Sequence, residues 1–542
     1  MKKTLCSLRG NCWLPLAALG LALAGCGGSQ NWSHDAAYVT IGGQVSGLTG
    51  GKLVLANNGS DLLSVTSSGT FTFALKLAPN ATYAVTVKTQ PDGAVCAVTS
   101  GGTGTAATNV VNVAVNCLPD VSVGGTVSGL NGGTVVLQNN NADDLTVGTE
   151  GSFTFARKIH DGGAYAVTVK TPPNGELCYV ANGAGTAAGN VTSVAITCSP
   201  FVRRPLPDIY RTGKAIAYSA YRAGGPGVAE MPSDASVLQD LALLDAAGFN
   251  LLRLFGADNV AEKIISLAQM NYPQMRFQAG IYLQGASNSC VDSVNSAQMN
   301  KAISLANTYP TVVSVSVGNE TSFAGNLPVG CLASYIQNVR AQVTQPVTAD
   351  DDYTFYAGLT STGEKPDTVL PLLDFVAIHM YPISTYGRWD WLQLGVASGP
   401  DRAAAMMHAS LQSAVDSYTA VANYTYRDNT GSTVSIAASL PIVIGETGWK
   451  ATQTNPNSQI ELYAANQVNQ KWYVDLLNSW QAAGTGPLTI FYFEGFDEAW
   501  KGHDDGWGLW DASRTARYAL CGNIALYGDC QPSVYDGAGY YP

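Results

Sequence analysis

Ile442-Val-Ile-Gly-Glu-Thr-Gly-Trp449 is an apolar run that leads into a single carboxylate, Glu446. Its apolar part, Pro441–Gly445, is typical of a buried β-strand, because parallel strands covered on both faces have near-continuous apolar sequences. Val315-Ser-Val-Gly-Asn-Glu320 repeats the pattern, with a strand expected over Val312–Val317 and a carboxylate just after it. The C-terminal region is thus expected to contain two buried strands that each lead directly to a glutamate.

Six more strands are expected around these two, with helical stretches between several of them. Ser236–Ala247 is one such helix, with Ser233 as its N-cap and Gly248 just after its end. Eight βα units over about 330 residues predict a (β/α)8 TIM barrel with insertions. A doubly wound sheet is the alternative, but no glycine-rich phosphate loop follows the first strand. The six strands are expected over Lys214–Tyr218, Leu251–Phe255, Arg276–Tyr282, Pro346–Ala349, Phe375–His379 and Leu488–Phe493.

Glu320 and Glu446 follow the fourth and seventh expected strands. The C-terminal ends of the strands form the active face of such a barrel. A carboxylate that emerges there from an apolar strand is partly desolvated, which tends to raise its pKa. Glycoside hydrolysis needs two carboxyl groups beside the bond, one protonated and one ionised. The two glutamates are therefore the predicted catalytic pair.

The region from Lys214 to Asp511 resembles glycoside hydrolase family 17, the β-1,3-glucanase-like enzymes. The resemblance rests on the two stretches quoted above, on Phe491-Tyr-Phe-Glu-Gly-Phe-Asp-Glu-Ala-Trp-Lys501 and on Gly506–Leu509. It implies a retaining mechanism without a cofactor, in which Glu320 is the general acid/base and Glu446 the nucleophile. It also implies that Asn319 contacts the sugar 2-hydroxyl and that Glu498 and Lys501 line the active site.

The sequence departs from this family after the sixth expected strand. Asp374-Phe-Val-Ala-Ile-His379-Met-Tyr381-Pro382 has a histidine in a segment where the family often has asparagine. His379 either takes over a sugar contact or packs in the core, and the sequence leaves both open. Residues 384–440 and 500–542 match poorly, so endo or exo action also stays open.

Aromatic side chains near strand ends are candidates for stacking on the C–H face of a sugar. Trp449 is the leading candidate. The acidic stretches Asp350-Asp-Asp352 and Asp504-Asp505 are expected to be solvated loops, since they lack the spacing of a calcium loop. No metal site is expected. The other aromatic candidates are Tyr218, Tyr381, Phe493 and Trp500.

The N-terminus has the pattern of a bacterial lipoprotein signal. Lys2, Lys3 and Arg9 precede an apolar run, Trp13–Ala24, that is too short for a stable membrane span. Leu23-Ala-Gly-Cys26 resembles a lipobox, in which the cysteine is diacylated and becomes the mature N-terminus. We expect Cys26 to attach the protein to the bacterial outer membrane or cell surface.

An internal repeat with an offset of 82 residues (123 − 41) precedes the expected barrel. Ile41-Gly-Gly-Gln-Val-Ser-Gly aligns with Val123-Gly-Gly-Thr-Val-Ser-Gly. Apolar residues alternate with Ser, Thr and Asn, which predicts short antiparallel strands and two Ig-like β-sandwiches. These serve as a stalk or as glycan-binding modules. The expected organisation is a signal peptide (1–25), a tether (26–37), two β-sandwiches (38–119 and 120–200), a linker (201–213) and the barrel (214–542).

Cysteine usage indicates an oxidising compartment. Of eleven cysteines, Cys6 and Cys12 leave with the signal peptide and Cys26 is lipidated, so eight remain. An even number predicts disulfides. Their order along the chain favours the pairs Cys96–Cys117, Cys178–Cys198, Cys290–Cys331 and Cys521–Cys530.

Charge narrows the choice of partners. The formal net charge is −11, the pI is about 4.9 and no run rich in Lys and Arg is present. Nucleic acid is therefore not an expected partner, whereas a neutral polysaccharide is compatible. The sequence leaves the oligomeric state open.

The leading function is a retaining β-1,3-glucan hydrolase. A β-1,3-glucanosyltransferase would use the same two glutamates, with a sugar hydroxyl in place of water. A non-catalytic surface glycan-binding lipoprotein is the third alternative. The presence of Glu320 and Glu446 together with Asn319 argues against that last reading.

Overall fold

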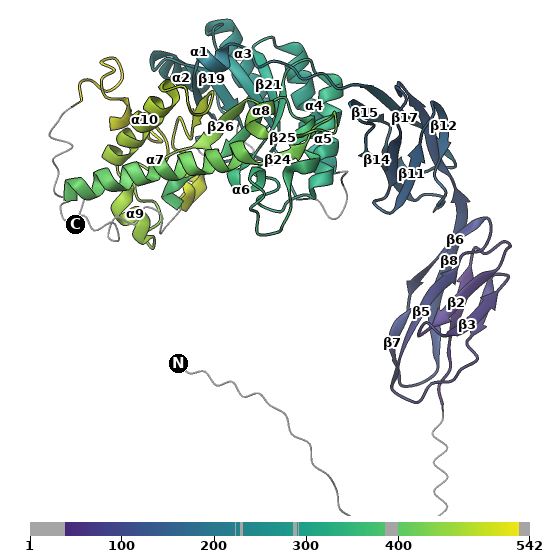
Figure 1. The fold of residues 1–542 in the computed structure, drawn as a ribbon. Coiled ribbons are helices and arrows are strands. Elements are labelled where there is room, and N and C mark those ends of the chain that lie inside the picture. The colour runs from purple at the N-terminus through teal and green to yellow at the C-terminus, as the bar shows by residue number, and fades with distance from the viewer. Residues whose placement is uncertain are drawn as a thin grey trace, which may run out of the picture. The chain divides into compact units, whose positions relative to one another are not determined.

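The computed structural model describes residues 38–530, apart from 223, 228–230, 286–289, 291 and 385–398 (Figure 1). The predicted signal peptide and Cys26 lie outside the described residues. Among the helices that are described, none combines the length and the apolar character needed to cross a membrane. The chain divides into two compact units, Met1–Leu118 and Pro119–Pro542.

The first unit contains a β-sandwich. Its core is formed by residues such as Ile41, Leu53 and Phe71, which face inward from the two sheets. One sheet has the order β4 (Gly69–Thr72), β1 (Ile41–Ser46), β8 (Val110–Val121) and β6 (Ala94–Ser100). The other has the order β3 (Asp61–Val65), β2 (Leu53–Asn57), β5 (Ala81–Thr89) and β7 (Thr103–Ala106).

The second unit begins with a β-sandwich of the same topology, as the sequence repeat predicts. A short strand, β13 (Ile159–His160), pairs with the end of β8, at Val121 and Asp120. One sheet has the order β12 (Gly151–Thr154), β9 (Val123–Ser128), β17 (Val191–Pro200) and β15 (Glu176–Ala181). The other has the order β11 (Asp143–Val147), β10 (Val135–Asn139), β14 (Ala164–Thr171) and β16 (Ala184–Thr186).

The first and last strands of each sandwich pair in parallel, β1 with β8 and β9 with β17. The expectation of antiparallel strands throughout is therefore wrong for these two pairs, because alternation of apolar residues fixes the exposed face of a strand and not its direction. The repeated Gly-Gly motif is explained by this pairing. A Cβ atom at Gly43 would lie 1.8 Å from the carbonyl oxygen of Val113, and one at Gly125 would lie 1.7 Å from that of Val194.

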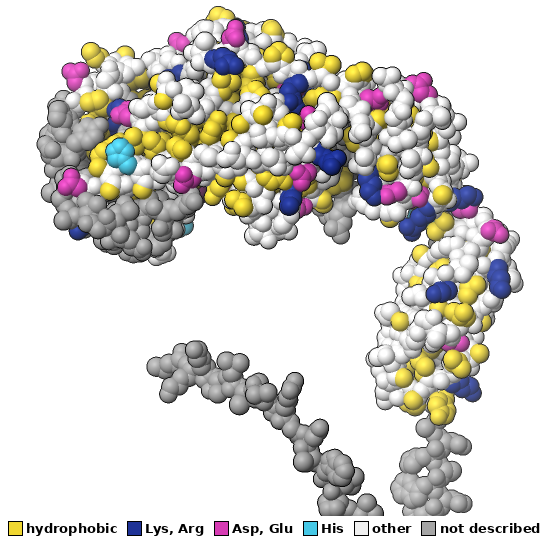
Figure 2. Space-filling model, viewed as in Figure 1, with side chains coloured by type: hydrophobic (Ala, Val, Ile, Leu, Met, Phe, Trp, Pro, Cys, Tyr) yellow, Lys and Arg dark blue, Asp and Glu magenta, His cyan; other side chains and the backbone are white. Residues whose placement is uncertain are grey.

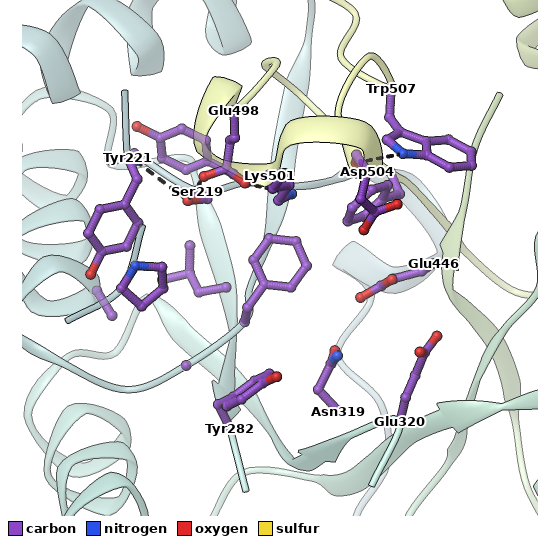
Figure 3. A pocket seen from close by; sticks show the side chains of 18 of the residues that line it. Ser219, Tyr221, Tyr282, Asn319, Glu320, Glu446, Glu498, Lys501, Asp504 and Trp507 are labelled. Carbon is purple, nitrogen blue, oxygen red and sulfur yellow. Dashed lines mark hydrogen bonds and ion pairs between the residues drawn. The ribbon is translucent and has the colours of Figure 1, made fainter. Parts of the chain in front are cut away.

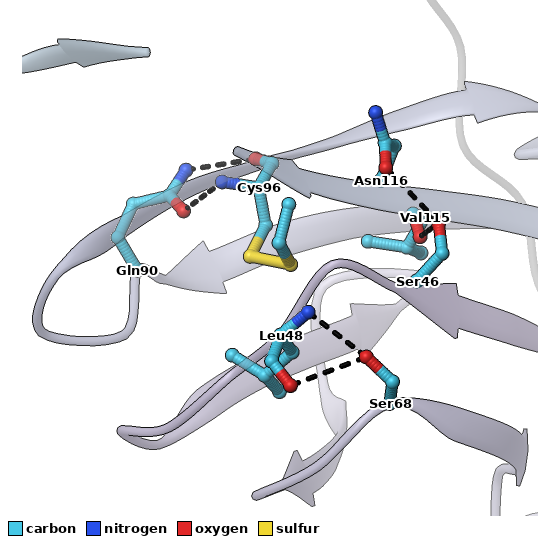
Figure 4. Close-up of a disulfide and its surroundings, with 8 residues drawn as sticks. Ser46, Leu48, Ser68, Gln90, Cys96, Val115 and Asn116 are labelled. Atoms are coloured by element: carbon cyan, nitrogen blue, oxygen red, sulfur yellow. Dashed lines mark hydrogen bonds between the residues drawn. A yellow bond between two sulfur atoms is a disulfide. The ribbon is translucent and has the colours of Figure 1, made fainter. Parts of the chain in front are cut away.

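A disulfide joins neighbouring strands in each sandwich. Cys96–Cys117 links β6 to β8, and Cys178–Cys198 links β15 to β17. Near the first of these, the side chain of Gln90 donates to the carbonyl of Cys96 and accepts from its N–H group, at 3.0 and 2.7 Å (Figure 4). Cys290–Cys331 and Cys521–Cys530 also form, so all four predicted pairings are confirmed.

The rest of the second unit is a closed barrel of eight parallel strands. All eight expected strands are confirmed, and the fold class is two β-sandwiches followed by a (β/α)8 barrel. The strand order around the barrel is β18 (Lys214–Ala217), β19 (Phe249–Leu254), β20 (Arg276–Ile281), β21 (Val312–Asn319), β22 (Val347–Asp352), β23 (Val376–His379), β26 (Ile442–Thr447) and β27 (Ile490–Tyr492).

Helices surround these strands (Figure 1). The predicted helix is α2, whose N-cap Ser233 accepts from the N–H of Ser236 and which is followed by Gly248 at φ +80°. A hairpin of β24 (Thr425–Arg427) and β25 (Thr433–Ser435) follows α7. The helices are α2 (Asp234–Ala246), α3 (Asn259–Asn271), α4 (Ser293–Thr308), α5 (Val329–Gln342), α6 (Tyr353–Tyr356), α7 (Gly399–Asn423), α8 (Ile436–Ser439), α9 (Gln459–Ala464) and α10 (Gln467–Ala482).

The segment expected to be a linker closes the N-terminal end of the barrel. It contains the short helix α1 (Ile209–Thr212), and Tyr210 on this helix is fully buried against Phe375 and Phe491. The Tyr210 hydroxyl donates to Oε1 of Gln278 at 2.7 Å. With this end filled by side chains, the opposite end is left for a functional site.

Surface charge is mixed on the described part that Figure 2 shows. Dark blue Lys and Arg side chains are interspersed with magenta Asp and Glu side chains there, without a continuous basic area.

Candidate active site

A cleft of about 820 Å³ opens at the C-terminal ends of the barrel strands (Figure 3). It brings most of the predicted site residues together. All eight barrel strands contribute to its walls, through their C-terminal residues or through the segments that follow them. The predicted residues that line it are Tyr218, Asn319, Glu320, Tyr381, Glu446, Phe493, Glu498, Trp500 and Lys501.

Glu320 lies directly after β21 with a backbone φ of +48°, a conformation that is uncommon for a residue with a side chain. Neighbouring groups hold this turn. The N–H of Glu320 donates to the carbonyl of Asp350 at 2.9 Å. The carboxylate of Asp351 accepts from the N–H groups of Ser322 and Phe323, at 2.8 and 3.1 Å. The Glu320 side chain is 30% exposed and reaches the cleft from this fixed position.

Glu446 lies on β26 and is nearly buried. Its Oε1 accepts from Nη1 of Arg253 at 2.5 Å, and its Oε2 accepts from the Tyr381 hydroxyl at 2.6 Å. Burial by itself would raise the pKa of Glu446. His379, Arg253 and Tyr381 outweigh that effect, and the pKa of Glu446 lies below its usual value. Glu446 is therefore ionised at neutral pH.

His379 lies beneath both carboxylates. Its Nδ1 is 3.0 Å from Oε1 of Glu320 and 3.6 Å from Oε2 of Glu446. Burial opposes protonation of His379, but the two glutamates together raise its pKa above the usual value. The side chain is fully buried and is not among the described residues that line the cleft, so the structure favours a packed histidine that contacts both carboxylates.

Glu320, His379 and Glu446 also offer one potential metal-ligand atom each, and these atoms lie within 4.8 Å of one another. The guanidinium group of Arg253 already contacts Glu446 and would repel a cation placed there. The arrangement suits a pair of reacting carboxyl groups better than a metal site.

Arg253 on β19 organises the reaction centre, and the sequence analysis missed it. Its guanidinium group donates to Asp350, to Glu446 and, at 2.6 Å, to Oδ1 of Asn319. This contact with Oδ1 fixes the orientation of the Asn319 side chain, which lines the cleft. The side chain of Arg253 is only 1% exposed. A lone arginine within Leu251–Phe255 was the signal that could have revealed this role.

A second charged cluster contributes Glu498 and Lys501 to the same cleft. Nζ of Lys501 contacts Oε2 of Glu494 at 2.7 Å and Oε2 of Glu498 at 2.6 Å, and it lies 4.7 Å from the centre of the Phe493 ring. Glu498 and Lys501, which the resemblance implied to line the active site, both line the cleft and contact each other. Glu494 is an unpredicted member, and burial raises its pKa well above the usual value.

Three aromatic rings form one side of the cleft next to Glu446. Tyr381 contacts Phe493 and Trp507 edge to face, with ring centres 5.7 and 5.2 Å apart. Trp507 was not singled out from the sequence. Tyr218 borders the cleft but is almost fully buried, with its hydroxyl 3.2 Å from Oδ2 of Asp240.

Trp449 does not lie where the sequence analysis placed it. Its side chain is fully buried, its Nε1 donates to the carbonyl of Ala464 at 2.8 Å, and its ring packs beside Tyr473 of α10. It is absent from the described residues that line the cleft. The expectation of a subsite wall at Trp449 is wrong, because the chain after β26 directs this ring against α10.

The expectation of solvated acidic loops is also wrong for Asp350-Asp-Asp352. Asp350 and Asp351 are buried on β22, where they hold Arg253 and the turn after Glu320. Asp504 is exposed and lines the cleft. Asp505 accepts from the N–H of Glu498 at 2.8 Å.

A (β/α)8 barrel whose fourth and seventh strands carry facing glutamates defines a barrel-type glycoside hydrolase. Residues 215–509 match the family model described as the BtgE/BtgC glycoside hydrolase domain. This match covers more than half of the chain, and the chain belongs to this family.

Two known proteins show further similarity. Glucan 1,3-beta-glucosidase of Schizosaccharomyces pombe is 26% identical over 219 residues, which are 39% of this chain and 57% of that protein. The chain thus spans just over half the length of this relative. The crystal structure of an endo-laminarinase from Formosa Hel1_33_131 superposes with a TM-score of 0.50 at 20% identity. That match covers 60% of this chain and 92% of the other, and it supports the fold.

Proposed function

We propose that the protein is a retaining glycoside hydrolase that cleaves β-1,3-glucan by double displacement. The observation that carries the proposal is the separation of the two glutamates. A carboxylate oxygen of Glu320 lies within 4.8 Å of one of Glu446. Carboxyl groups are about 5–5.5 Å apart in retaining enzymes and roughly 6.5–9.5 Å apart in inverting enzymes, which need room for a water.

The surroundings of the two glutamates support different roles. Glu446 is ionised and held by Arg253 and Tyr381, as a nucleophile must be. Glu320 is more exposed and faces the cleft, where it can protonate the leaving oxygen. One Glu446 oxygen then forms a bond to the anomeric carbon as the glycosidic bond breaks and Glu320 gives up its proton. In the second step Glu320 takes a proton from water, whose oxygen displaces Glu446.

The family supports glycoside hydrolysis, and the names of the two similar proteins, which refer to glucan 1,3-linkages and to laminarin, support the substrate class. One name describes a glucosidase and the other an endo-acting enzyme. Chain-end and internal cleavage are thus both represented among the similar proteins.

The stereochemistry of the first product tests the mechanism. We expect a proton NMR time course with a soluble β-1,3-glucan oligosaccharide to show the β-anomer before mutarotation. An α-anomer that forms first would contradict double displacement. A parallel panel of β-1,3-, β-1,6- and mixed-linkage glucans tests the substrate. Products longer than the substrate would show that a sugar hydroxyl replaces water, and binding without turnover would identify a glycan-binding protein.

A further inference from the structure

Three exposed aromatic side chains line the cleft. Tyr282 is 44% exposed, Phe323 is 53% exposed and Trp500 is 41% exposed. They belong to three separate segments, which follow β20, β21 and β27. Aromatic rings are more stable when they are removed from water, and exposed apolar side chains that gather in one groove mark a binding surface. The rings therefore indicate a ligand that covers them.

Trp500 is held in place by contacts within the protein. Its Nε1 donates to Oε1 of Glu498 at 3.2 Å. Glu498 is fixed in turn by the Ser219 hydroxyl and by Lys501. The backbone of Gly225 lies against the indole, since a Cβ atom there would come within 2.6 Å of the ring. A ring that is already immobile loses little conformational freedom when a ligand stacks on it.

Trp500 belongs to the part of the cleft away from the reacting carboxylates. In Figure 3, Glu498 and Ser219 lie toward Tyr221, whereas Glu320 and Glu446 lie toward the other end. Trp500 is bonded to Glu498 and therefore lies in the first of these regions. Tyr282 lies across the cleft from Glu498 in the same view.

The chemistry of this region matches a sugar ring. A pyranose whose hydroxyls are all equatorial, as in β-glucose, presents axial C–H groups on both faces and a polar rim. The faces suit the indole, and the rim suits hydrogen-bonding side chains. Gln284 and Gln298 line the same cleft and can supply such groups, as can Tyr221, whose hydroxyl already donates to Asp258 at 3.0 Å.

We propose that Trp500 forms a subsite for a glucose unit remote from the cleaved bond, with Tyr282 on the facing wall. The inference rests on the proposed function, because it assumes that a β-glucan occupies the cleft. Each added sugar unit strengthens binding until the Trp500 subsite is filled. Long oligosaccharides depend on Trp500, and the shortest ones do not.

Calorimetric titration of the inactive variant Glu446→Gln with β-1,3-gluco-oligosaccharides of increasing length tests this dependence. Adding Trp500→Ala should weaken binding of the long oligosaccharides by about tenfold and leave the shortest bound one unchanged. Tyr527→Ala is the matched control, since Tyr527 is also 41% exposed but is not among the described residues of the cleft. Equal affinities for long oligosaccharides with and without Trp500 would overturn the proposal.

Fluorescence provides a measurement that does not depend on the alanine variant folding. Residues 38–200 contain no tryptophan, so neither sandwich contributes to the signal. A long oligosaccharide should change the emission of Glu446→Gln, and Trp500→Phe should remove most of that change while the ligand still binds. An unaltered change would reject Trp500 as the contact.

The same titrations separate this inference from the proposed function. If Glu446→Gln binds no β-1,3-gluco-oligosaccharide and the wild type cleaves none, the proposed substrate is wrong, and the subsite falls with it. If Glu446→Gln binds the oligosaccharides and the wild type cleaves them, but Trp500→Ala changes the affinity at no length, only the subsite is rejected.

Discussion

The hydroxyl group of Tyr381 donates a hydrogen bond of 2.6 Å to Oε2 of Glu446. This bond favours the ionised carboxylate and is one of the contacts that lower the pKa of Glu446 against the opposite effect of burial. In the proposed double displacement this bond weakens when Glu446 becomes an ester, because an ester oxygen is a weaker acceptor than a carboxylate. The strength of this one contact therefore differs between the stages of the reaction.

Tyr381→Phe should lower kcat/KM by roughly ten- to a hundredfold, by analogy with the loss of one donor from a preorganised site. With that donor gone, the pKa of Glu446 rises. The acidic limb of the pH profile of kcat/KM should therefore move to higher pH. Tyr426→Phe is the control, because Tyr426 is a buried tyrosine whose hydroxyl contacts Ser439 outside the cleft. An unshifted acidic limb in Tyr381→Phe would mean that the hydroxyl does not act on Glu446.

Azide should distinguish the roles of the two glutamates. Glu320→Ala should keep some glycosylation by an activated aryl glycoside, because a good leaving group needs little protonation. Azide should then accelerate release of the sugar and yield a β-glycosyl azide. Glu446→Ala should be inactive until azide replaces the nucleophile, and the product should be an α-glycosyl azide. Characterisation of both azides by NMR checks the assignment, and exchanged anomers would mean exchanged roles.

Asp351 should make stability depend on pH through the turn that carries Glu320. Burial, opposed by three backbone N–H donors, raises its pKa from 3.8 to about 6. A carboxyl group whose pKa is higher in the folded state contributes stability that is complete below the unfolded value. That contribution is lost as the pH rises through about 6.

The substitution Asp351→Asn should therefore destabilise the barrel more at about pH 4 than at about pH 7, by up to roughly 3 kcal/mol for this one group. Unfolding followed by tryptophan fluorescence measures the difference. Asp428→Asn is the control, for which we expect the opposite pH dependence of the loss of stability. Hydrogen bonds from Thr430 outweigh the weak effect of burial and lower the pKa of Asp428, so its contribution is lost as the pH falls. The same pH trend in both variants would contradict the account of Asp351.

We propose a lipid anchor at Cys26, which lies outside the described residues. Cys26→Ser should move the protein from the membrane fraction to the soluble fraction of the native host, because acyl chains then no longer hold it. Fractionation with and without a salt wash measures this. If the variant stays with the membrane after the wash, Cys26 is not the anchor.

The barrel could be predicted because strands such as β21 and β26 are apolar almost throughout and end in polar residues. The catalytic pair could be predicted for the same reason, since the ends of parallel strands converge at one face. The disulfide pairing could be predicted because each cysteine pairs with the next one along the chain. These are all local signals, readable one segment at a time.

The missed features depend on contacts between distant segments. Three consecutive aspartates have the sequence of a solvated loop. Their burial depends on the contact of Asp350 with Arg253, which is almost a hundred residues earlier in the chain. Trp449 has the sequence position of a sugar-stacking residue, but its ring packs against Tyr473 of α10. The parallel pairing of β1 with β8 has a similar origin, since one strand alone does not show which neighbour it meets or in which direction.

Arg253 has a consequence for redesign of this enzyme. Its guanidinium group is buried and donates to Glu446, Asn319 and Asp350 at once. Shortening Glu446 to alanine or glycine would leave a cavity that already has a fixed cation on its wall. Such a cavity is suited to small anions such as formate or to the fluorine of an α-glycosyl fluoride donor. On the proposed retaining mechanism and substrate, the variant would be a glycosynthase, a catalyst that builds β-glucan and cannot degrade it.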